Sequence, residues 1–230
     1  MRQPAQPAQP DQPAVVSGLD AAFERAMSLA GRGRTVLGIA GAPGAGKSTL
    51  TDALLDRLRE QPPAGADASW VAHVPMDGFH LADVQLARLG LLDRKGAPET
   101  FDVDGYAATL ARLHDEPGRT VYAPGFERTL EQPISAALAV TPAARIVVTE
   151  GNYLLLDTGG WERVRRLVDE IWFVESPPGR VERLVERHVR FGKSPEAARA
   201  WVERVDEANA LLVEATRAAA DVVVRPATLR

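Results

Sequence analysis

The run from Gly41 to Ser48, GAPGAGKS, has the residue types and spacing that most directly indicate chemistry in this sequence. It fits the pattern G-x-x-x-x-G-K-[ST], in which glycines let backbone N–H groups turn toward a phosphate. The lysine supplies a charge for the β- and γ-phosphates, and the serine hydroxyl can ligate Mg²⁺. We therefore predict a loop that binds a nucleoside triphosphate. The predicted nucleotide contacts are Gly41, Ala42, Pro43, Gly44, Ala45, Gly46, Lys47, Ser48 and Thr49.

Two carboxylates follow apolar runs that are typical of buried strands. Asp77 comes after residues 70–76, WVAHVPM, and Glu150 comes after residues 145–149, RIVVT. Ligands of open parallel sheets gather at the carboxyl ends of strands, so both acids are candidates for chemistry. Asp77 could accept the proton of an attacking hydroxyl, and Glu150 could hold Mg²⁺ directly or through water. Each acid could instead cap a turn, and the sequence leaves that alternative open.

A basic series near the end of the chain has helical spacing. Its members are Arg180, Arg183, Arg187 and Arg190, with Lys193 just beyond. Spacings of three and four put these arginines along one side of a helix, which is usually a solvated charged face. Here the series leads into the hinge-like tip at residues 191–193, FGK. We predict a lid that closes over the triphosphate, with Arg187 and Arg190 as its catalytic members and Arg187 also contacting nucleotide.

The elements that must position these residues alternate between strands and helices. Residues 36–40 read as the strand before the loop, and residues 47–60 as the helix after it. Further strands are expected at 121–123, 170–174 and 221–225, and further helices at 83–89, 106–113, 177–191 and 195–219. This alternation predicts an α/β fold with one central parallel sheet. We expect a single domain over residues 17–230, with a lid at about 180–195. Residues 1–16, rich in Gln, Pro and Ala, are expected to be a disordered tail.

The composition excludes several other classes of protein. The chain has no cysteine, so disulfides, thiolate chemistry and Cys-based zinc sites are excluded. The four histidines show no metal-ligand spacing, and the net charge of −4 gives no reason to expect a nucleic-acid partner. No run approaches the roughly 18 apolar residues that cross a bilayer, and no secretory signal is visible. We expect a cytoplasmic protein with a small-molecule hydroxyl substrate and no membrane partner. A homodimer stays open as its assembly.

Taken with other blocks, these motifs resemble the phosphoribulokinase, uridine kinase and pantothenate kinase superfamily. The blocks that carry the resemblance are GAPGAGKST at 41–49, MDGFHL at 76–81, LGLLDRKGAPETFD at 89–102, VYAPGFER at 121–128, TEGNYLLL at 149–156, RHVRFGKS at 187–194 and NALLVEATRAAADVVV at 209–224. They are spread over nearly the whole chain after the tail, in the order expected for the superfamily. The resemblance implies a three-layer P-loop NTPase fold with a helical lid. It also implies an ATP-dependent kinase that uses Mg²⁺ and phosphorylates a hydroxyl of a small metabolite.

Carried over by position, the resemblance makes Asp77 the catalytic base. Glu127 stands where uridine kinases have an acid that holds ribose hydroxyls, and Arg128 stands where pantothenate kinases have a histidine that binds the acceptor. The predicted substrate contacts are Asp77, Phe79, His80, Glu127, Arg128 and Asn209. Glu127 with Arg128 could also be a solvated surface pair, and Asn209 could lie on a helix surface.

The vicinal hydroxyls that Glu127 suits favour a nucleoside- or sugar-like acceptor. A pantothenate kinase-like activity is the first alternative. From another class, a non-catalytic or regulatory nucleotide-binding protein is the second. Against that second alternative, the sequence has no N-K-x-D element, which usually reads guanine in switch proteins.

Overall fold

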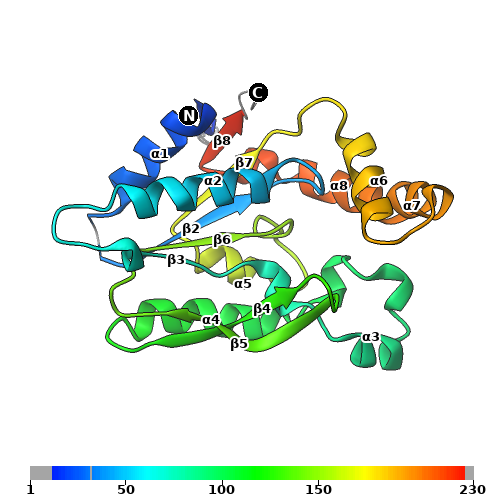
Figure 1. Ribbon diagram of the computed structural model, residues 1–230, viewed down its shortest axis with the longest axis horizontal. Helices are drawn as coiled ribbons and strands as arrows, with labels where there is room; N and C mark the ends of the chain where they lie inside the picture. Colours follow the sequence, from blue (N-terminus) through cyan, green and yellow to red (C-terminus); the bar gives the residue numbers. More distant parts are fainter. Residues whose placement is uncertain (1–11, 32, 226–230) are drawn as a thin grey trace, which may run out of the picture.

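The computed structural model describes residues 12–31 and 33–225, and a six-stranded parallel sheet lies at its centre. The strand order is β1-β8-β7-β2-β6-β3, and its neighbours pair in parallel. These strands are β1 (Ala14–Ser17), β2 (Thr35–Ala40), β3 (Val71–His73), β6 (Ile146–Glu150), β7 (Glu170–Val174) and β8 (Val222–Arg225). The predicted fold with a central parallel sheet flanked by helices is confirmed (Figure 1).

Helices cover both faces of the sheet and make the outer two of three layers. The α-helices of the described residues are α1 (Gly18–Leu29), α2 (Lys47–Glu60), α3 (Asp83–Leu89), α4 (Val103–Asp115), α5 (Trp161–Arg166), α6 (Arg180–Arg190), α7 (Pro195–Trp201) and α8 (Glu207–Glu214). The apolar sides of α1 and α2 pack on one face of the sheet, and those of α4 and α5 pack on the other (Figure 1). The predicted helices at 47–60 and 83–89 have the observed bounds of α2 and α3.

Strand β2 explains why this sheet is the core of the molecule. All six of its residues are buried, as expected for a parallel strand with helices on both faces. Val36 and Ala40 face the cluster that includes α4 and α5, whereas Leu37 and Ile39 face the cluster that includes α1 and α2. Because successive side chains point to opposite faces, one short run of apolar residues holds both layers and fixes the start of the phosphate loop.

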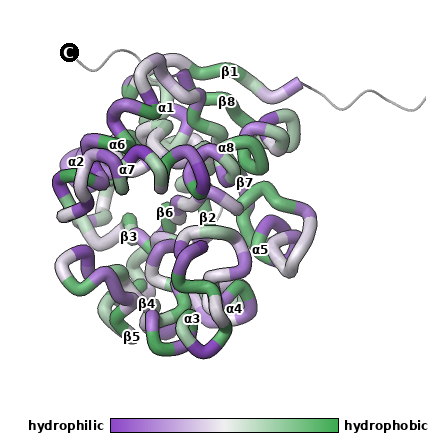
Figure 2. Tube along the Cα trace, turned by 90° about the vertical axis from the view of Figure 1, so that its right-hand side faces the viewer, coloured by the Kyte–Doolittle hydropathy of each residue, from purple (hydrophilic) through white to green (hydrophobic). Residues whose placement is uncertain are grey.

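The segment predicted to be a lid, at about residues 180–195, forms helix α6 and the turn that follows it, and we keep the name lid for this segment. Helices α6 and α7 lie beside the carboxyl ends of the central strands, at the right of Figure 1. In Figure 2 much of the tube around α7 is hydrophilic purple, whereas β1 and β8 carry hydrophobic green. A π-helical turn, Val202–Asp206, joins α7 to α8. None of the described helices combines the length and the apolarity that crossing a membrane requires.

The predicted disordered tail is wrong at its end. Residues Ala14, Val15 and Val16 form β1, which pairs with Val222 to Val224 of β8. After the last proline of the tail these residues regain backbone donors, and β8 offers them an unpaired edge. Residues 1–11 of the predicted tail lie outside the described residues.

A single parallel sheet was also too simple a prediction. Strands β4 (Val121–Glu127) and β5 (Gln132–Val140) form a separate antiparallel hairpin. The sequence did not indicate β5, because its residues, QPISAALAV, show no alternation of apolar and polar side chains, and five of the nine are exposed. The hairpin packs against the turn after β3 and supplies one wall of the site described below.

Candidate active site

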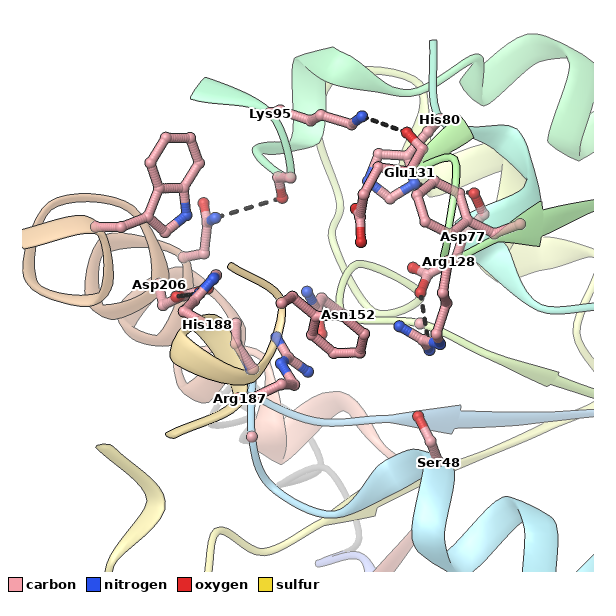
Figure 3. A pocket seen from close by; sticks show the side chains of 18 of the residues that line it. Ser48, Asp77, His80, Lys95, Arg128, Glu131, Asn152, Arg187, His188 and Asp206 are labelled. Atoms are coloured by element: carbon pink, nitrogen blue, oxygen red, sulfur yellow. Dashed lines mark hydrogen bonds and ion pairs between the residues drawn. The ribbon is translucent and has the colours of Figure 1, made fainter. Parts of the chain in front are cut away.

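A cavity of about 430 Å³ lies where the phosphate loop, the hairpin and the lid meet. Its lining side chains come from the phosphate loop, the turn after β3, residues 92–96, the β4–β5 hairpin, the turn after β6, the lid and α8. Figure 3 shows these segments, which are distant in sequence, turning side chains toward one space. A cavity of this volume suits a small molecule.

The phosphate loop has the backbone that its sequence predicts. Gly46 has a φ of 94° and comes directly before Lys47, the first residue of α2. Gly44 has a φ of 75°, and a Cβ atom there would lie 2.8 Å from Cγ of Leu184 on α6. Glycine therefore permits both the left-handed turn and the close packing of the lid helix. The positive end of α2 points into the same region, which favours a bound phosphate.

Lys47 is held inside the loop by two oxygen atoms. Its Nζ donates to the Ala42 carbonyl at 3.0 Å and to Oδ1 of Asn152 at 2.7 Å. Burial lowers the pKa of the Lys47 amine to about 8, although the nearby carboxylates of Glu150 and Asp77 favour its charged form. A phosphate would add negative charge and favour protonation, so the amine suits an anionic ligand.

Asp77 lines the cavity from the 3-10 turn Met76–Phe79, which begins three residues after the end of β3. Its side chain is 42% exposed, and its Oδ2 lies 3.9 Å from Nη2 of Arg128 on the hairpin. Its backbone carbonyl lies 2.9 Å from Nδ1 of His80. Because a carbonyl oxygen only accepts, Nδ1 of His80 carries the proton and Nε2 remains an acceptor when the ring is neutral. Burial lowers the pKa of His80, which favours that neutral ring.

Glu150 and Ser48 are the residues that fit Mg²⁺. Burial raises the pKa of the Glu150 carboxyl, while the charge of Lys47 opposes that rise. Oε2 of Glu150 is buried and has no hydrogen-bond partner among the described residues, and Ser48 lines the same cavity. Residues 12–31 and 33–225 contain no group of three or more His, Cys, Asp or Glu side chains that could hold a metal ion alone. The oxygen atoms of Glu150 and Ser48 therefore suit a Mg²⁺ ion that keeps water ligands and also contacts the phosphates of a nucleotide.

The four arginines of the predicted lid series have different environments. Arg187 and Arg190, both on α6, are both exposed. Only Arg187 of the two lines the cavity (Figure 3). Arg180 donates to a carbonyl of the phosphate loop at 3.0 Å, and Arg183 donates to a carbonyl of the preceding turn at 2.7 Å. The four arginines therefore do not act together from one side of the helix, although the spacing had predicted that they would. Arg180 ties the lid to the loop, and Arg187 faces the site.

The predicted substrate contacts are also divided. His80, Arg128 and Asn209 line the cavity. Phe79 does not: it is 5% exposed and packs in the core, its ring 4.6 Å from that of Tyr106. Its short 3-10 turn directs the ring inward, so the structure gives no support to Phe79 as a substrate contact.

Glu127 also lies outside the cavity lining. Its Oε1 accepts from the backbone N of Thr129 at 3.0 Å and from its Oγ1 at 2.8 Å, and these hydrogen bonds lower the pKa of the carboxyl. Phe126 and Arg128 line the cavity instead. Phe126 and Glu127 are successive residues of β4 and point to opposite sides, so Glu127 faces away from the cavity that Phe126 lines.

Several cavity residues were missed by sequence reasoning. They are Asp83, Lys95, Phe126, Glu131, Asn152, His188, Trp201 and Asp206. Asn152 had a usable signal, because it comes two residues after a strand-end acid. Lys95 had none: its Nζ donates to Oδ1 of Asp83 at 2.6 Å and to the Glu131 carbonyl at 2.6 Å, contacts that only the folded chain creates.

Comparisons with known proteins find similarity over nearly the whole chain. A protein of Schizosaccharomyces pombe provisionally named a uridine kinase is 32% identical over 224 residues, which are 94% of this chain and 93% of that protein. The crystal structure of a protein from Silicibacter sp. TM1040, provisionally named a fructose transport system kinase, is 37% identical with a TM-score of 0.78. That similarity covers 89% of this chain and 98% of the other.

Two further matches are shorter. The pantothenate kinase of Bacillus velezensis is 34% identical over 123 residues, which are 52% of this chain and 36% of that enzyme. A family model described as methylmalonyl Co-A mutase-associated GTPase MeaB matches residues 12–77. That stretch contains the phosphate loop and ends at Asp77, before the hairpin, the lid and α8.

Proposed function

The chain belongs to the P-loop kinase superfamily and is an ATP-dependent kinase, and we propose that it phosphorylates a hydroxyl of a nucleoside- or sugar-like metabolite. One observation carries the proposal: Asp77 lines the same cavity as Lys47 and Ser48 of the phosphate loop. A carboxylate there is suited to take a proton from a hydroxyl that attacks the terminal phosphate.

The proposed transfer assigns each step to a group of this chain. The acceptor oxygen bonds to the γ-phosphorus, the bond from that phosphorus to the β,γ-bridging oxygen breaks, and ADP leaves. Asp77 takes the hydroxyl proton. Lys47 and Arg187 hold the phosphate charges in line, and lid closure keeps water out. Ser48 and Glu150 would hold Mg²⁺, which supplies neutralisation of the phosphate charge when it is bound.

The comparisons favour a nucleoside- or sugar-like acceptor over pantothenate. Two relatives matched over nearly their full lengths carry uridine kinase and fructose transport kinase names, whereas 36% of the pantothenate kinase is matched. The acceptor wall fits a ring with hydroxyls. The rings of His80 and Phe126 pack at a tilt of 48°, with 5.1 Å between their centroids, and Nε2 of His80 is available as an acceptor. Such a wall combines an apolar face with oriented polar groups.

A regulatory nucleotide-binding protein is the candidate from another class, and the match to a GTPase family model is the observation in its favour. The matched residues 12–77 contain the phosphate loop and end before the hairpin, the lid and α8. Arg128, Arg187 and Asn209 line the cavity from outside that stretch. A phosphate loop alone binds nucleotide for many functions, so the cavity beyond it favours the kinase.

An acceptor screen tests the proposal directly. Purified protein with Mg²⁺ and ATP is offered uridine, cytidine, nicotinamide riboside, pantothenate and fructose, and both ADP and phosphorylated product are measured. We expect stoichiometric ADP and phosphorylated product with a nucleoside or sugar. Product only from pantothenate would overturn the acceptor assignment. ADP and free phosphate without product, at a rate raised only by a protein partner, would support the regulatory alternative.

A further inference from the structure

The wall of the cavity opposite Asp77 contains a π-helical turn. Figure 3 shows Asp206 and His188 on one side of the cavity and Asp77 and Arg128 on the other. Asp206 is the last residue of the turn Val202–Asp206. Such turns insert an extra residue into a helix and frequently occur at functional sites. Asp206 and Asn209 are three residues apart, so they lie on the same side of the helix, and both line the cavity.

Asp206 offers one carboxylate oxygen to the cavity. The residue is 8% exposed, and its Oδ2 accepts from Nε2 of His188 at 2.8 Å. Oδ1 of Asp206 has no hydrogen-bond partner among the described residues, and this atom is not fully buried. This oxygen is therefore accessible although the residue is nearly buried. The second carboxylate oxygen can therefore accept a hydrogen bond from a ligand in the cavity.

Asn209 offers a second acceptor beside the first. The residue is 5% exposed, and its Nδ2 donates to the Gly96 carbonyl at 3.3 Å. Because a carbonyl oxygen only accepts, the amide nitrogen must face Gly96 and Oδ1 must face away from it. Within the described part of the chain, Oδ1 of Asn209 has no partner, and it too is not fully buried.

We propose that Oδ1 of Asp206 and Oδ1 of Asn209 form an acceptor-binding subsite for a group that carries two hydrogen-bond donors. The inference rests on the proposed function and adds to it the chemistry of the substrate's far end. That end bears hydroxyl or N–H donors and no carboxylate or phosphate, since an anion would meet the charge of Asp206. His188 positions Asp206 by occupying its other oxygen. Asp206 is thus a specificity-determining residue, remote from the reacting hydroxyl.

Asp206→Asn tests the subsite with little change in shape. The new amide can still accept from His188 through its oxygen, which turns its NH₂ group toward the cavity. The substitution thereby replaces an acceptor with a donor at the proposed contact. Glu203→Gln is the matched control, because Glu203 lies in the same π-helical turn, is exposed and does not line the cavity. It loses the same charge without touching the subsite.

The measurement is KM for ATP and for each phosphorylated compound among uridine, fructose and pantothenate, in the wild type and both variants. We expect Asp206→Asn to raise the acceptor KM about tenfold or more, the scale of one lost charged hydrogen bond. KM for ATP should stay within about twofold, and Glu203→Gln should match the wild type. Equal rises in both KM values, or a fall in kcat alone, would show that Asp206 acts through the lid and would overturn the subsite.

A second measurement separates failure of the subsite from failure of the proposed function. If the wild type phosphorylates none of the three compounds, the proposed acceptor class fails. Their binding to protein saturated with a non-hydrolysable ATP analogue is then measured by calorimetry. Tighter binding of uridine or fructose to the wild type than to Asp206→Asn supports the subsite. Equal binding, or undetectable binding to both proteins, overturns it.

Discussion

Nη2 of Arg128 lies 3.9 Å from Oδ2 of Asp77, across the junction between the β4–β5 hairpin and the turn after β3. Both side chains are about half exposed, so this ion pair contributes little stability by itself. Its consequence is positional: it sets a cation beside the proposed base, on the acceptor side of the cavity. The hairpin therefore takes part in the site together with the phosphate loop.

Asp77→Asn tests the base directly. The amide cannot accept a proton from the acceptor hydroxyl, so we expect phosphoryl transfer to fall by about 10²–10⁴-fold. ATP affinity should stay within about twofold, because Lys47 and Ser48 are unchanged. Transfer is measured by product formation and affinity by calorimetry. Asp93→Asn, at an exposed acid that does not line the cavity, is the control. Normal turnover by Asp77→Asn would remove the assigned role.

Arg187 and Arg190 form a natural pair for testing the lid. Only Arg187 lines the cavity, although both belong to α6. Arg187→Ala should lower kcat by about 10–100-fold through loss of charge stabilisation on the transferred phosphoryl group. Arg190→Ala should change kcat by less than about twofold, since surface changes away from the site have small effects. Steady-state kinetics check both values. Equal losses in the two variants would contradict this division.

Lys47 predicts a pH dependence of nucleotide binding. In the free protein burial lowers its pKa to about 8, and bound phosphates raise that pKa again. Below about pH 8 the amine is charged in both states, and affinity is flat. Above about pH 8 the Lys47 amine of the free protein is mostly neutral and must take up a proton when ATP binds. The affinity for ATP therefore falls as the pH rises.

Calorimetry at pH 7 and pH 9 in buffers of different ionisation enthalpy measures this proton uptake. Uptake should be larger at pH 9. Lys47→Arg, whose guanidinium stays charged, should abolish the difference. An uptake that is the same at both pH values in the wild type would exclude Lys47 as the titrating group.

Glu150→Gln should separate stability from activity. Burial raises the pKa of Glu150 in the folded protein above its unfolded value, so the ionised form costs folding free energy at pH 7. This cost in folding free energy is absent at pH values below the pKa of Glu150 in the unfolded protein. It is fully present above the pKa of Glu150 in the folded protein. The neutral amide should raise the melting midpoint of nucleotide-free protein by roughly 2–4 °C, the shift for about 1 kcal/mol in a chain of this size.

The same substitution should raise the Mg²⁺ concentration for half-maximal rate about tenfold, as for loss of an outer metal contact. Scanning calorimetry and a Mg²⁺ titration of ADP release measure the two effects. A lower melting midpoint together with an unchanged Mg²⁺ requirement would show that Glu150 is structural.

Much of the fold and of the nucleotide end could be predicted from the sequence. The helix at 47–60 and the fully buried strand before it follow from short runs of contiguous residues. The two strand-end acids, Asp77 and Glu150, were found because parallel strands bring their carboxyl ends to one edge of a sheet. Strand β5 was missed, because its residues show no alternation of apolar and polar side chains and pairing with β4 alone makes it a strand.

By itself the sequence determined the phosphate loop and the acids beside it, since their geometry depends on local backbone conformation and on a general rule of parallel sheets. Only the tertiary structure decided which residues make the acceptor end. It turned Glu127 away and Arg128 inward, separated Arg187 from Arg190, and brought Asp206 opposite Asp77. The physical reason is that the direction of a side chain on a hairpin or lid is set by packing between distant segments, which no local pattern records.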